Sequence, residues 1–141
     1  MATFETEPRG QGDVERGLRE RGERYPTVVV ERDGAVLAWA SASVYRPREC
    51  YAGIGEFSVY VAREARGEGL GRAALEALIA ESERRGLWKL VSRIFPENAA
   101  SLALCRAVGF REVGTYRRHG RLDGEWKDVI VVERLLGEAS R

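Results

Sequence analysis

The sequence predicts a mixed α/β (or α+β) fold in which helices pack on a single sheet. Residues 56–62, "EFSVYVA", alternate apolar and polar side chains as a strand does, whereas apolar residues after Gly71 recur at three- and four-residue spacing, as in a helix. The resulting order of elements, α-β-β-β-α-β-α-β-β, mixes the two types along the whole chain. With 141 residues, the chain has the length of one compact domain, residues 1–141.

The first half is expected to contribute one helix and three strands. Residues 13–24 are highly charged and open on an aspartate, a residue type that caps helix N-termini, so they predict a surface helix. Residues 27–45 indicate two strands joined at Asp33-Gly34, and residues 46–55 indicate a loop. In the strand that follows, one face carries Phe57, Val59 and Val61, and the other carries Glu56, Ser58 and Tyr60.

The second half is expected to contain two helices, a strand and a long hairpin. The first helix has a core-facing stripe of Gly71, Ala74, Leu75, Leu78 and Ile79, and it ends at Gly86. A strand over residues 87–95 follows, and then a helix that starts near Asn98 and ends before Gly109. The tail predicts a hairpin that turns at Asp123-Gly124. The tryptophans, Trp39, Trp88 and Trp126, are expected in the core or at an interface.

Composition and charge argue against several classes of function. The formal charge of +1 gives no electrostatic case for nucleic acid, and no apolar run approaches the ~20 residues that span a bilayer. The polar N-terminus is not that of a signal peptide. Cys50, Cys105 and the single histidine, His119, form no metal-binding pattern, and the thiols are expected to be free in a reducing cytoplasm.

A glycine-rich segment between the third strand and the following helix is the main candidate site. Gly67, Gly69 and Gly71 alternate between Arg66 and Arg72, where bare backbone and the free amides of a helix N-terminus would bind a pyrophosphate. Counted from Gly69, the pattern also fits a dinucleotide fingerprint, but the next strand has no acidic residue for a ribose, and no P-loop lysine follows. A strand–helix connection that binds nothing is the other alternative. The candidate residues are Arg66, Gly67, Glu68, Gly69, Leu70, Gly71 and Arg72.

Here the sequence resembles the GNAT family of acetyl-CoA-dependent N-acyltransferases. The family signature Q/R-x-x-G-x-G-A/G reads Arg66 to Arg72 in this chain, with Arg72 where a small residue is usual. "NAASLALCRAVGF" resembles the second family motif, N-x-x-S/A-x-x-x-Y-x-x-x-G-F. "FETEP", "RYP", "EFSVYV" and "GEWKDV" resemble the phosphinothricin acetyltransferase branch, and "YRRHGRLDGEW" resembles its arsinothricin-type members.

The resemblance implies a GNAT fold with acetyl-CoA as co-substrate and no metal. It places the pantetheine arm along the backbone of Val59, Tyr60 and Val61, and implies contacts from the second motif through Asn98, Ser101 and Cys105. Glu56 matches the general base of the branch, and a carboxylate suits the removal of a proton from an α-ammonium group, whose pKa is ~7.7–8.0. Cys105 stands where many members have a tyrosine that protonates the leaving thiolate, so it is not expected to be that acid.

The acceptor side follows from the loop before Glu56. Arg48 and Tyr51 match branch positions, and a guanidinium can bind an α-carboxylate through two hydrogen bonds. Tyr45 and Tyr51 would wall the pocket, and Phe4 would close it. The implied substrates are small amino acids or glutamate analogues of the phosphinothricin, methionine sulfoximine or arsinothricin type, with a role in antibiotic resistance. The resemblance also implies a cytoplasmic homodimer.

One departure from the family concerns the N-terminus. Family members carry a strand and a helix ahead of "ATFETEP", and this chain starts at Met1, so it is expected to be an N-terminally truncated version of the fold. The sheet edge beside Thr27–Val30 would then be bare and open to pairing with another chain. Two alternatives therefore stay open: a protein or peptide N-acetyltransferase, and a non-catalytic acyl-CoA-binding module.

Overall fold

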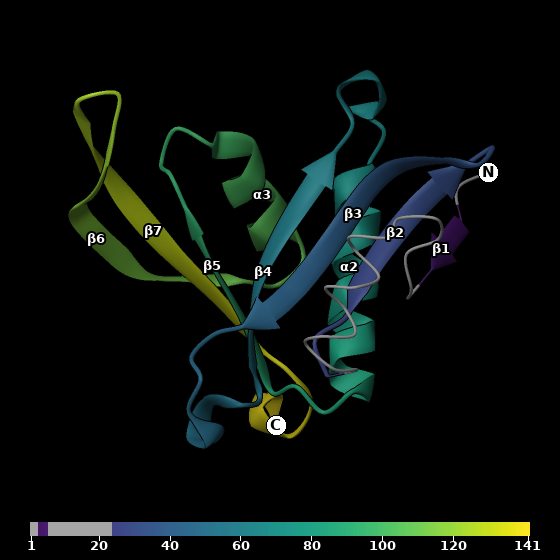
Figure 1. Ribbon diagram of the computed structural model, residues 1–141, viewed down its shortest axis with the longest axis horizontal. Helices are drawn as coiled ribbons and strands as arrows, with labels where there is room; N and C mark the ends of the chain where they lie inside the picture. The colour runs from purple at the N-terminus through teal and green to yellow at the C-terminus, as the bar shows by residue number, and fades with distance from the viewer. Residues whose placement is uncertain (1–2, 6–23) are drawn as a thin grey trace. The chain divides into compact units, whose positions relative to one another are not determined.

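The computed structural model describes residues 3–5 and 24–141, and within them it is a mixed α and β structure (Figure 1). The chain divides into two compact units, Met1–Leu90 with Leu135–Arg141, and Val91–Arg134. The helix expected over residues 13–24 lies almost wholly outside the described residues, and the single domain over residues 1–141 stays a prediction.

The first unit contains four antiparallel strands that neighbour one another in chain order. They are β1 (Thr3–Glu5), β2 (Thr27–Arg32), β3 (Ala35–Val44) and β4 (Ile54–Val61). The turn between β2 and β3 places Asp33 at φ 52° and Gly34 at φ 81°, both left-handed, as a two-residue Asp-Gly hairpin turn requires. The predicted hairpin is therefore confirmed, and β4 begins two residues earlier than expected.

The expectation of a bare sheet edge beside Thr27–Val30 was wrong in part. β1 pairs with β2 so that Phe4 lies opposite Val30, and Glu5 lies opposite Val29. The chain itself thus covers this part of the edge. Sequence reasoning missed β1 because three residues are too few to display a period of two.

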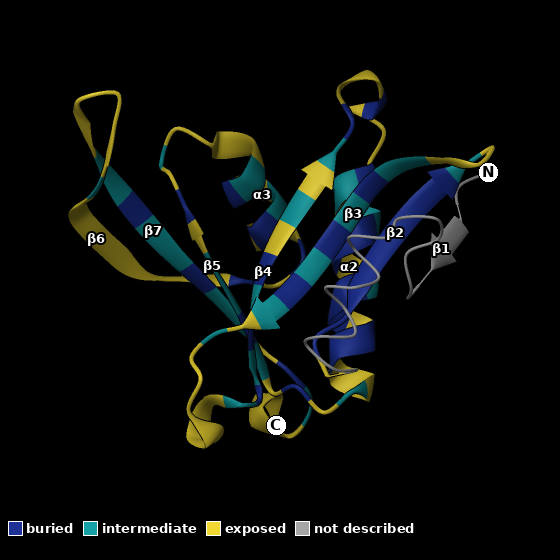
Figure 2. Ribbon diagram, viewed as in Figure 1, coloured by how far each residue is buried: buried dark blue, intermediate teal, exposed yellow. Residues whose placement is uncertain are grey.

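One helix of the first unit, α2 (Leu70–Arg84), packs against β2, β3 and β4 (Figure 1). The predicted stripe of Ala74, Leu75, Leu78 and Ile79 is buried. On β3, Ala38, Ala40 and Ala42 are fully buried and the residues between them are half-buried (Figure 2), which places the alanines on the face that α2 covers.

The C-terminus of α2 has the predicted glycine. Gly86 has φ 88°, and its amide donates to the Glu83 carbonyl (3.1 Å), while the amide of Leu87 donates to the Ser82 carbonyl (3.0 Å). This pair of hydrogen bonds is a Schellman motif, which satisfies carbonyls that would otherwise be unpaired at the helix end.

The second unit holds most of β5 (Lys89–Ile94), then α3 (Ala99–Ala107), β6 (Arg111–Leu122) and β7 (Glu125–Leu135), with β7 between β5 and β6 in strand order. Asn98 caps α3 by accepting a hydrogen bond from the Ser101 amide (3.2 Å). Gly109, at φ 92°, follows the helix, and the Phe110 amide donates to the Cys105 carbonyl (2.9 Å). Both predicted helix boundaries are confirmed.

The β6–β7 hairpin turns at Asp123-Gly124 as predicted, but an irregularity interrupts its ladder. Residues 117–119 of β6 lie opposite Asp128 alone, and the Arg118 amide donates to Asp128 Oδ1 (2.8 Å). Trp126 of this hairpin, which was expected in the core or at an interface, is exposed, so its placement at an interface stays a prediction. Trp88 is exposed as well and Trp39 is half-buried, so none of the three tryptophans is a core residue.

Candidate functional site

The glycine-rich segment forms an open turn between β4 and α2. After Val61 the chain makes a 3₁₀ turn over Arg63–Ala65, and Gly67 and Gly69 then adopt φ 85° and 77°. A Cβ at either glycine would meet nothing within 4 Å, so these positions require glycine for backbone conformation, and close packing does not demand it. The missing side chains leave the backbone of the turn uncovered toward a ligand.

The amides of this turn are arranged as an anion-binding site. The first hydrogen bond of α2 runs from the Ala73 amide to the Gly69 carbonyl (3.1 Å), so the amides of Leu70, Gly71 and Arg72 precede the hydrogen-bonded ladder. The N-cap is Gly69, which has no side chain that could occupy them. Together with the partial positive charge of the helix N-terminus, these donors favour a phosphate or diphosphate.

Charged side chains around the turn are paired in two places. Glu68, the one acidic residue among residues 66–72, accepts a hydrogen bond from Arg32 (2.8 Å) at side-chain exposures of 41% and 37%, respectively. Arg72 lies 3.6 Å from Glu76, and Arg66 is exposed. Because Arg32 offsets the Glu68 carboxylate, the turn does not present an uncompensated negative charge to an anionic ligand.

The side chain of Leu70 packs in the core. It is buried in the first turn of α2, so only its backbone amide remains for the predicted ligand contact. Gly69 and Gly71, on either side of Leu70, have no side chain, so they too can offer only their backbone amides. The turn thus offers backbone donors from residues 67–72 and guanidinium groups from Arg66 and Arg72.

β4 presents Glu56 on the sheet face opposite the one that α2 covers. Glu56 pairs with Ser43 of β3, whose hydroxyl donates to the Glu56 carbonyl (3.3 Å). Tyr60 follows on the same face, and its ring stacks on Trp39 with a centroid distance of 6.0 Å. Burial alternates along β4 as predicted, with Phe57 buried, Ser58 and Tyr60 exposed, and Glu56, Val59 and Val61 half-buried (Figure 2).

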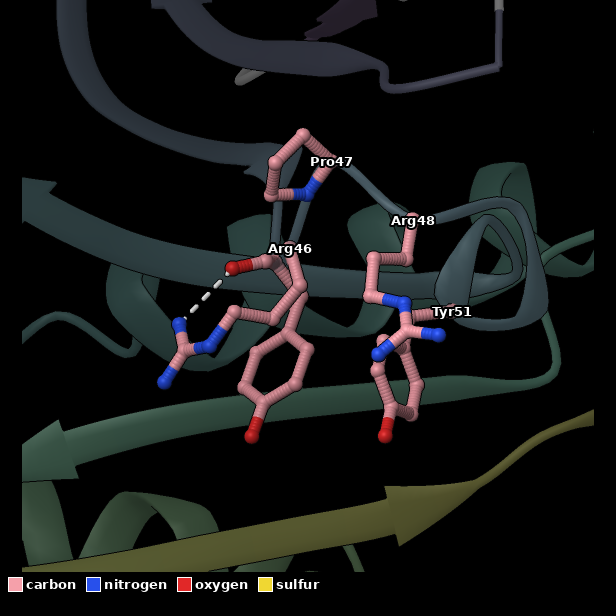
Figure 3. Close-up of a pocket in the computed structure, with 5 residues that line it drawn as sticks. Arg46, Pro47, Arg48 and Tyr51 are labelled. Carbon is pink, nitrogen blue, oxygen red and sulfur yellow. Dashed lines mark hydrogen bonds between the residues drawn. The ribbon is translucent and has the colours of Figure 1, made fainter.

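The predicted acceptor residues lie around one hollow in the β3–β4 loop. A hollow of about 450 Å³ is lined by Tyr45, Arg46, Pro47, Arg48 and Tyr51 (Figure 3). The rings of Tyr45 and Tyr51 meet edge to face with a centroid distance of 6.1 Å. Three predicted residues, Arg48, Tyr45 and Tyr51, are therefore brought together. Because Tyr45 follows the last residue of β3 and Ser43 faces Glu56, the hollow and Glu56 lie at the same end of the β3–β4 pair.

Two lining residues, Arg46 and Pro47, were missed by sequence reasoning, and Arg46 is the charged one. Its guanidinium carbon lies 4.4 Å from the centroid of the Tyr45 ring, and its Nη1 donates to the Tyr45 carbonyl (2.9 Å). A signal was present, since "YRPREC" carries two arginines two positions apart. Only the tertiary fold of the loop shows that both reach one hollow.

Hydrogen bonds to the backbone fix the second half of this loop. The amides of Tyr51 and Ala52 donate to the carbonyls of Arg48 (2.9 Å) and Glu49 (3.0 Å), forming the 3₁₀ turn Glu49–Tyr51. The hydroxyl of Tyr25 donates to the Ala52 carbonyl (2.8 Å). The hollow therefore lies on a loop whose second half is held by its own hydrogen bonds and by Tyr25.

The residues predicted from the second motif belong to the second unit. Asn98 is used as the N-cap of α3, and Cys105 is a buried residue of that helix with 3% exposure. Burial raises the pKa of the Cys105 thiol to about 11. A thiol of that pKa is a weaker acid than an ordinary thiol, whose pKa is 9.0, so it is a poor proton donor to a leaving thiolate.

Three further points concern the side chain of Phe4, metal sites and membrane spans. Phe4 lies in β1, but its side chain is outside the described part of the chain. Within residues 3–5 and 24–141, no group of three His, Cys, Asp or Glu residues could hold a metal ion. In the same residues, none of the helices has the length and apolar character needed to span a membrane.

The strand, the glycine turn and the helix together form an arrangement suited to a phosphate-bearing ligand at the N-terminus of α2. Comparison with known proteins gives the family. A sequence profile described as Acetyltransferase (GNAT) family matches residues 2–110, so the chain belongs to the GNAT family.

Two curated relatives are similar over most of this chain. It is 42% identical over 113 residues to a phosphinothricin N-acetyltransferase of Alcaligenes faecalis, an alignment that covers 79% of this chain and 57% of that protein. It is 39% identical over 113 residues to an L-methionine sulfoximine/L-methionine sulfone acetyltransferase of Pseudomonas paraeruginosa, with coverages of 79% and 66%. The chain thus spans less than two thirds of the length of these relatives.

A solved structure shows the same fold. The GNAT superfamily phosphinothricin acetyltransferase of Sinorhizobium meliloti, in complex with AcCoA, is 34% identical, with a TM-score of 0.81 over 94% of this chain and 72% of that one. The predicted mixed α and β GNAT fold is therefore confirmed.

Proposed function

We propose that this chain is an acetyl-CoA-dependent N-acetyltransferase that acetylates the amino group of a small amino acid or glutamate analogue. One observation carries the proposal: a single strand–turn–helix unit, from Glu56 to Arg72, holds a half-buried carboxylate at one end and an uncovered row of backbone amides at the other. Family membership and the AcCoA-bound relative support this reading.

The cofactor side uses the backbone. The amides of residues 67–72 bind the diphosphate of acetyl-CoA, and Arg66 and Arg72 add charge beside it. The backbone of Val59, Tyr60 and Val61 binds the pantetheine arm in the manner of an added strand. The resemblance to the family also implies ligand contacts from Asn98, Ser101 and Cys105, and these contacts stay predictions.

Acetyl-CoA supplies a thioester whose acyl carbon an amine can attack. Glu56 accepts the proton of the acceptor ammonium group, directly or through water, which leaves a neutral amine. As the new N–C bond forms, the C–S bond breaks, and the nitrogen releases its second proton to water to give the neutral amide. The thiolate leaves without the help of Cys105, consistent with the raised pKa of that thiol. A backbone amide near Val59 stabilises the negative charge that develops on the acyl oxygen.

The acceptor side uses the hollow of the β3–β4 loop. Arg48 binds the α-carboxylate of the acceptor, and Tyr45 and Tyr51 form walls. Phosphinothricin, methionine sulfoximine and arsinothricin are the acceptors that we propose, and their acetylation would confer resistance to the corresponding antibiotics. We propose that the protein acts in the cytoplasm as a homodimer, which light scattering after size-exclusion chromatography tests.

The test is a thiol-release assay with acetyl-CoA against a panel of amino acids, analogues and short peptides. The wild-type chain, Glu56→Gln and a control substitution of an exposed glutamate, Glu138→Gln, are compared. We expect Glu56→Gln to lose ~10²-fold or more in kcat and to retain acetyl-CoA binding, and the control to remain active. Unchanged turnover in Glu56→Gln would remove this residue from the mechanism. Turnover of peptides alone would indicate a protein acceptor, and binding without turnover would indicate an acyl-CoA-binding module.

A further inference from the structure

The residues that line the acceptor hollow carry positive charge and no negative charge. Two of its five lining residues are arginines, and none is acidic. Within the described residues, neither Arg46 nor Arg48 forms an ion pair with a carboxylate, although many other arginines of the chain do. Two uncompensated guanidinium groups at one hollow repel each other, and an anionic occupant would remove that repulsion.

Arg46 is held in place before any ligand arrives. Its guanidinium lies over the Tyr45 ring at 4.4 Å and donates one hydrogen bond to the Tyr45 carbonyl at 2.9 Å. A guanidinium has five N–H donors, so four remain for a ligand. Because the stacking and the hydrogen bond already restrict the side chain, binding an anion costs less conformational entropy than it would for a free surface arginine.

A single carboxylate on the acceptor can form an ion pair with only one of the two arginines. In the proposed function Arg48 takes the α-carboxylate, which leaves Arg46 without an anionic partner. We infer that Arg46 is a specificity-determining residue that binds a second anionic group at the far end of the acceptor, so that the preferred acceptors are amino acids with an anionic tail. This inference rests on the proposed function, because it assigns the hollow to the acceptor.

The inference separates the acceptors for which two relatives are named: phosphinothricin for one, and methionine sulfoximine or methionine sulfone for the other. A phosphinate tail carries a negative charge, whereas a sulfone or sulfoximine tail of the same shape is neutral. A guanidinium attracts an anionic oxygen by its full charge as well as by a hydrogen bond, whereas a neutral oxygen has no net charge to add to the hydrogen bond. In a partly open hollow, we expect this difference to give about a tenfold to hundredfold preference for the anionic tail.

A matched pair of ligands tests the inference. L-Phosphinothricin and L-methionine sulfone share the carbon chain, the terminal methyl group and two oxygens on a tetrahedral atom, and they differ in charge. Calorimetry measures the affinity of both for the chain saturated with coenzyme A, for Arg46→Gln and for a control at an exposed arginine, Arg141→Gln. We expect Arg46→Gln to weaken phosphinothricin binding about tenfold and to change sulfone binding less than about twofold, with the control unchanged.

Each outcome decides the question. Equal binding of the two ligands by the wild-type chain, absence of binding, or an equal loss for both in Arg46→Gln would overturn the role of Arg46. If Arg46→Gln does not fold, Arg46→Lys, which keeps the charge but cannot form the planar fork, should show a smaller selective loss. Selective binding without thiol release would retain this inference and reject the proposed activity. Turnover of both acceptors with equal kcat/KM would retain the activity and reject the inference.

Discussion

The indole of Trp88 occupies the space in which a side chain at Gly53 would stand. The carbonyl of Gly53 also accepts hydrogen bonds from the amides of Trp88 (2.7 Å) and Lys89 (3.2 Å), so that the ring is fixed against the backbone at the end of the β3–β4 loop. Trp88 is 40% exposed, so burial alone does not explain its position. The contact anchors the loop that carries Arg46, Arg48 and Tyr51.

Replacing Gly53 with alanine tests this anchor. The added methyl group would overlap the Trp88 ring, and we expect Gly53→Ala to lower the free energy of unfolding by about 1–3 kcal/mol. Gly114→Ala is the matched control, since a Cβ there meets nothing within 4 Å, and it should stay within about 0.5 kcal/mol. Denaturant unfolding gives both values. If Trp88→Ala does not relieve the cost of Gly53→Ala, the clash is not its cause.

The two left-handed glycines of the turn should be needed for conformation and for binding. Alanine at Gly67 or Gly69 meets no neighbouring atom, so its cost is that of a left-handed non-glycine residue, about 1–2 kcal/mol. Gly34→Ala, with φ 81° and equally open surroundings, should cost the same. Only Gly67→Ala and Gly69→Ala should also weaken acetyl-CoA binding in calorimetry. An equal loss of affinity in Gly34→Ala would show that the effect is general destabilisation.

The Arg32–Glu68 pair should tune the affinity for acetyl-CoA. Without Arg32 the Glu68 carboxylate would repel the bound diphosphate, so we expect Arg32→Gln to weaken binding about two- to fivefold at low salt. Glu68→Gln should not weaken binding, and the double variant should resemble Glu68→Gln. Affinities measured at several salt concentrations check this, because screening should reduce the effect. A loss in Arg32→Gln that persists in the double variant would contradict the charge argument.

The two cysteines should differ in their reactivity toward thiol reagents. Cys50 is exposed, whereas burial raises the pKa of the Cys105 thiol to about 11. A thiol reagent at pH 8 should therefore label Cys50 alone in the folded protein, and mass spectrometry of the labelled peptides checks this. Rapid labelling of Cys105 under native conditions would contradict its burial.

The same pKa shift predicts a dependence of stability on pH. The unfolded thiol ionises near its ordinary value of 9.0, while the folded thiol keeps its proton to about 11, so between these values the unfolded state binds fewer protons. The stability contributed by Cys105 should be complete below pH 9 and should fall as the pH rises toward 11. The difference in unfolding free energy between the wild-type chain and Cys105→Ala isolates this effect from other ionisations in that range. A difference that does not change across this range would show that the thiol is not buried in the folded protein.

Local signals in the sequence determined most of the elements correctly. The hairpin turns at Asp33-Gly34 and Asp123-Gly124 and the helix ends at Gly86 and Gly109 all depend on residues that favour left-handed backbone. The face of α2 follows from helical spacing alone. Such features were predictable because neighbouring residues decide them.

Features that depend on distant residues were not predictable. β1 becomes a strand only because β2 pairs with it, and Gly53 is required only because Trp88, far along the chain, packs on it. In the site, the motif identified the glycine turn and Arg48. The part played by Arg46 depends on how the loop folds back over Tyr45. A single sequence carries no local signal for such contacts.

The central claim is that the backbone amides of residues 67–72 hold the diphosphate of acetyl-CoA, and these amides can be observed directly. In a ¹⁵N-labelled sample titrated with acetyl-CoA, we predict that the largest amide chemical-shift changes occur at residues 67–72 and saturate as one site. If those amides keep their positions at saturating acetyl-CoA, or if no residue responds, the claim is wrong.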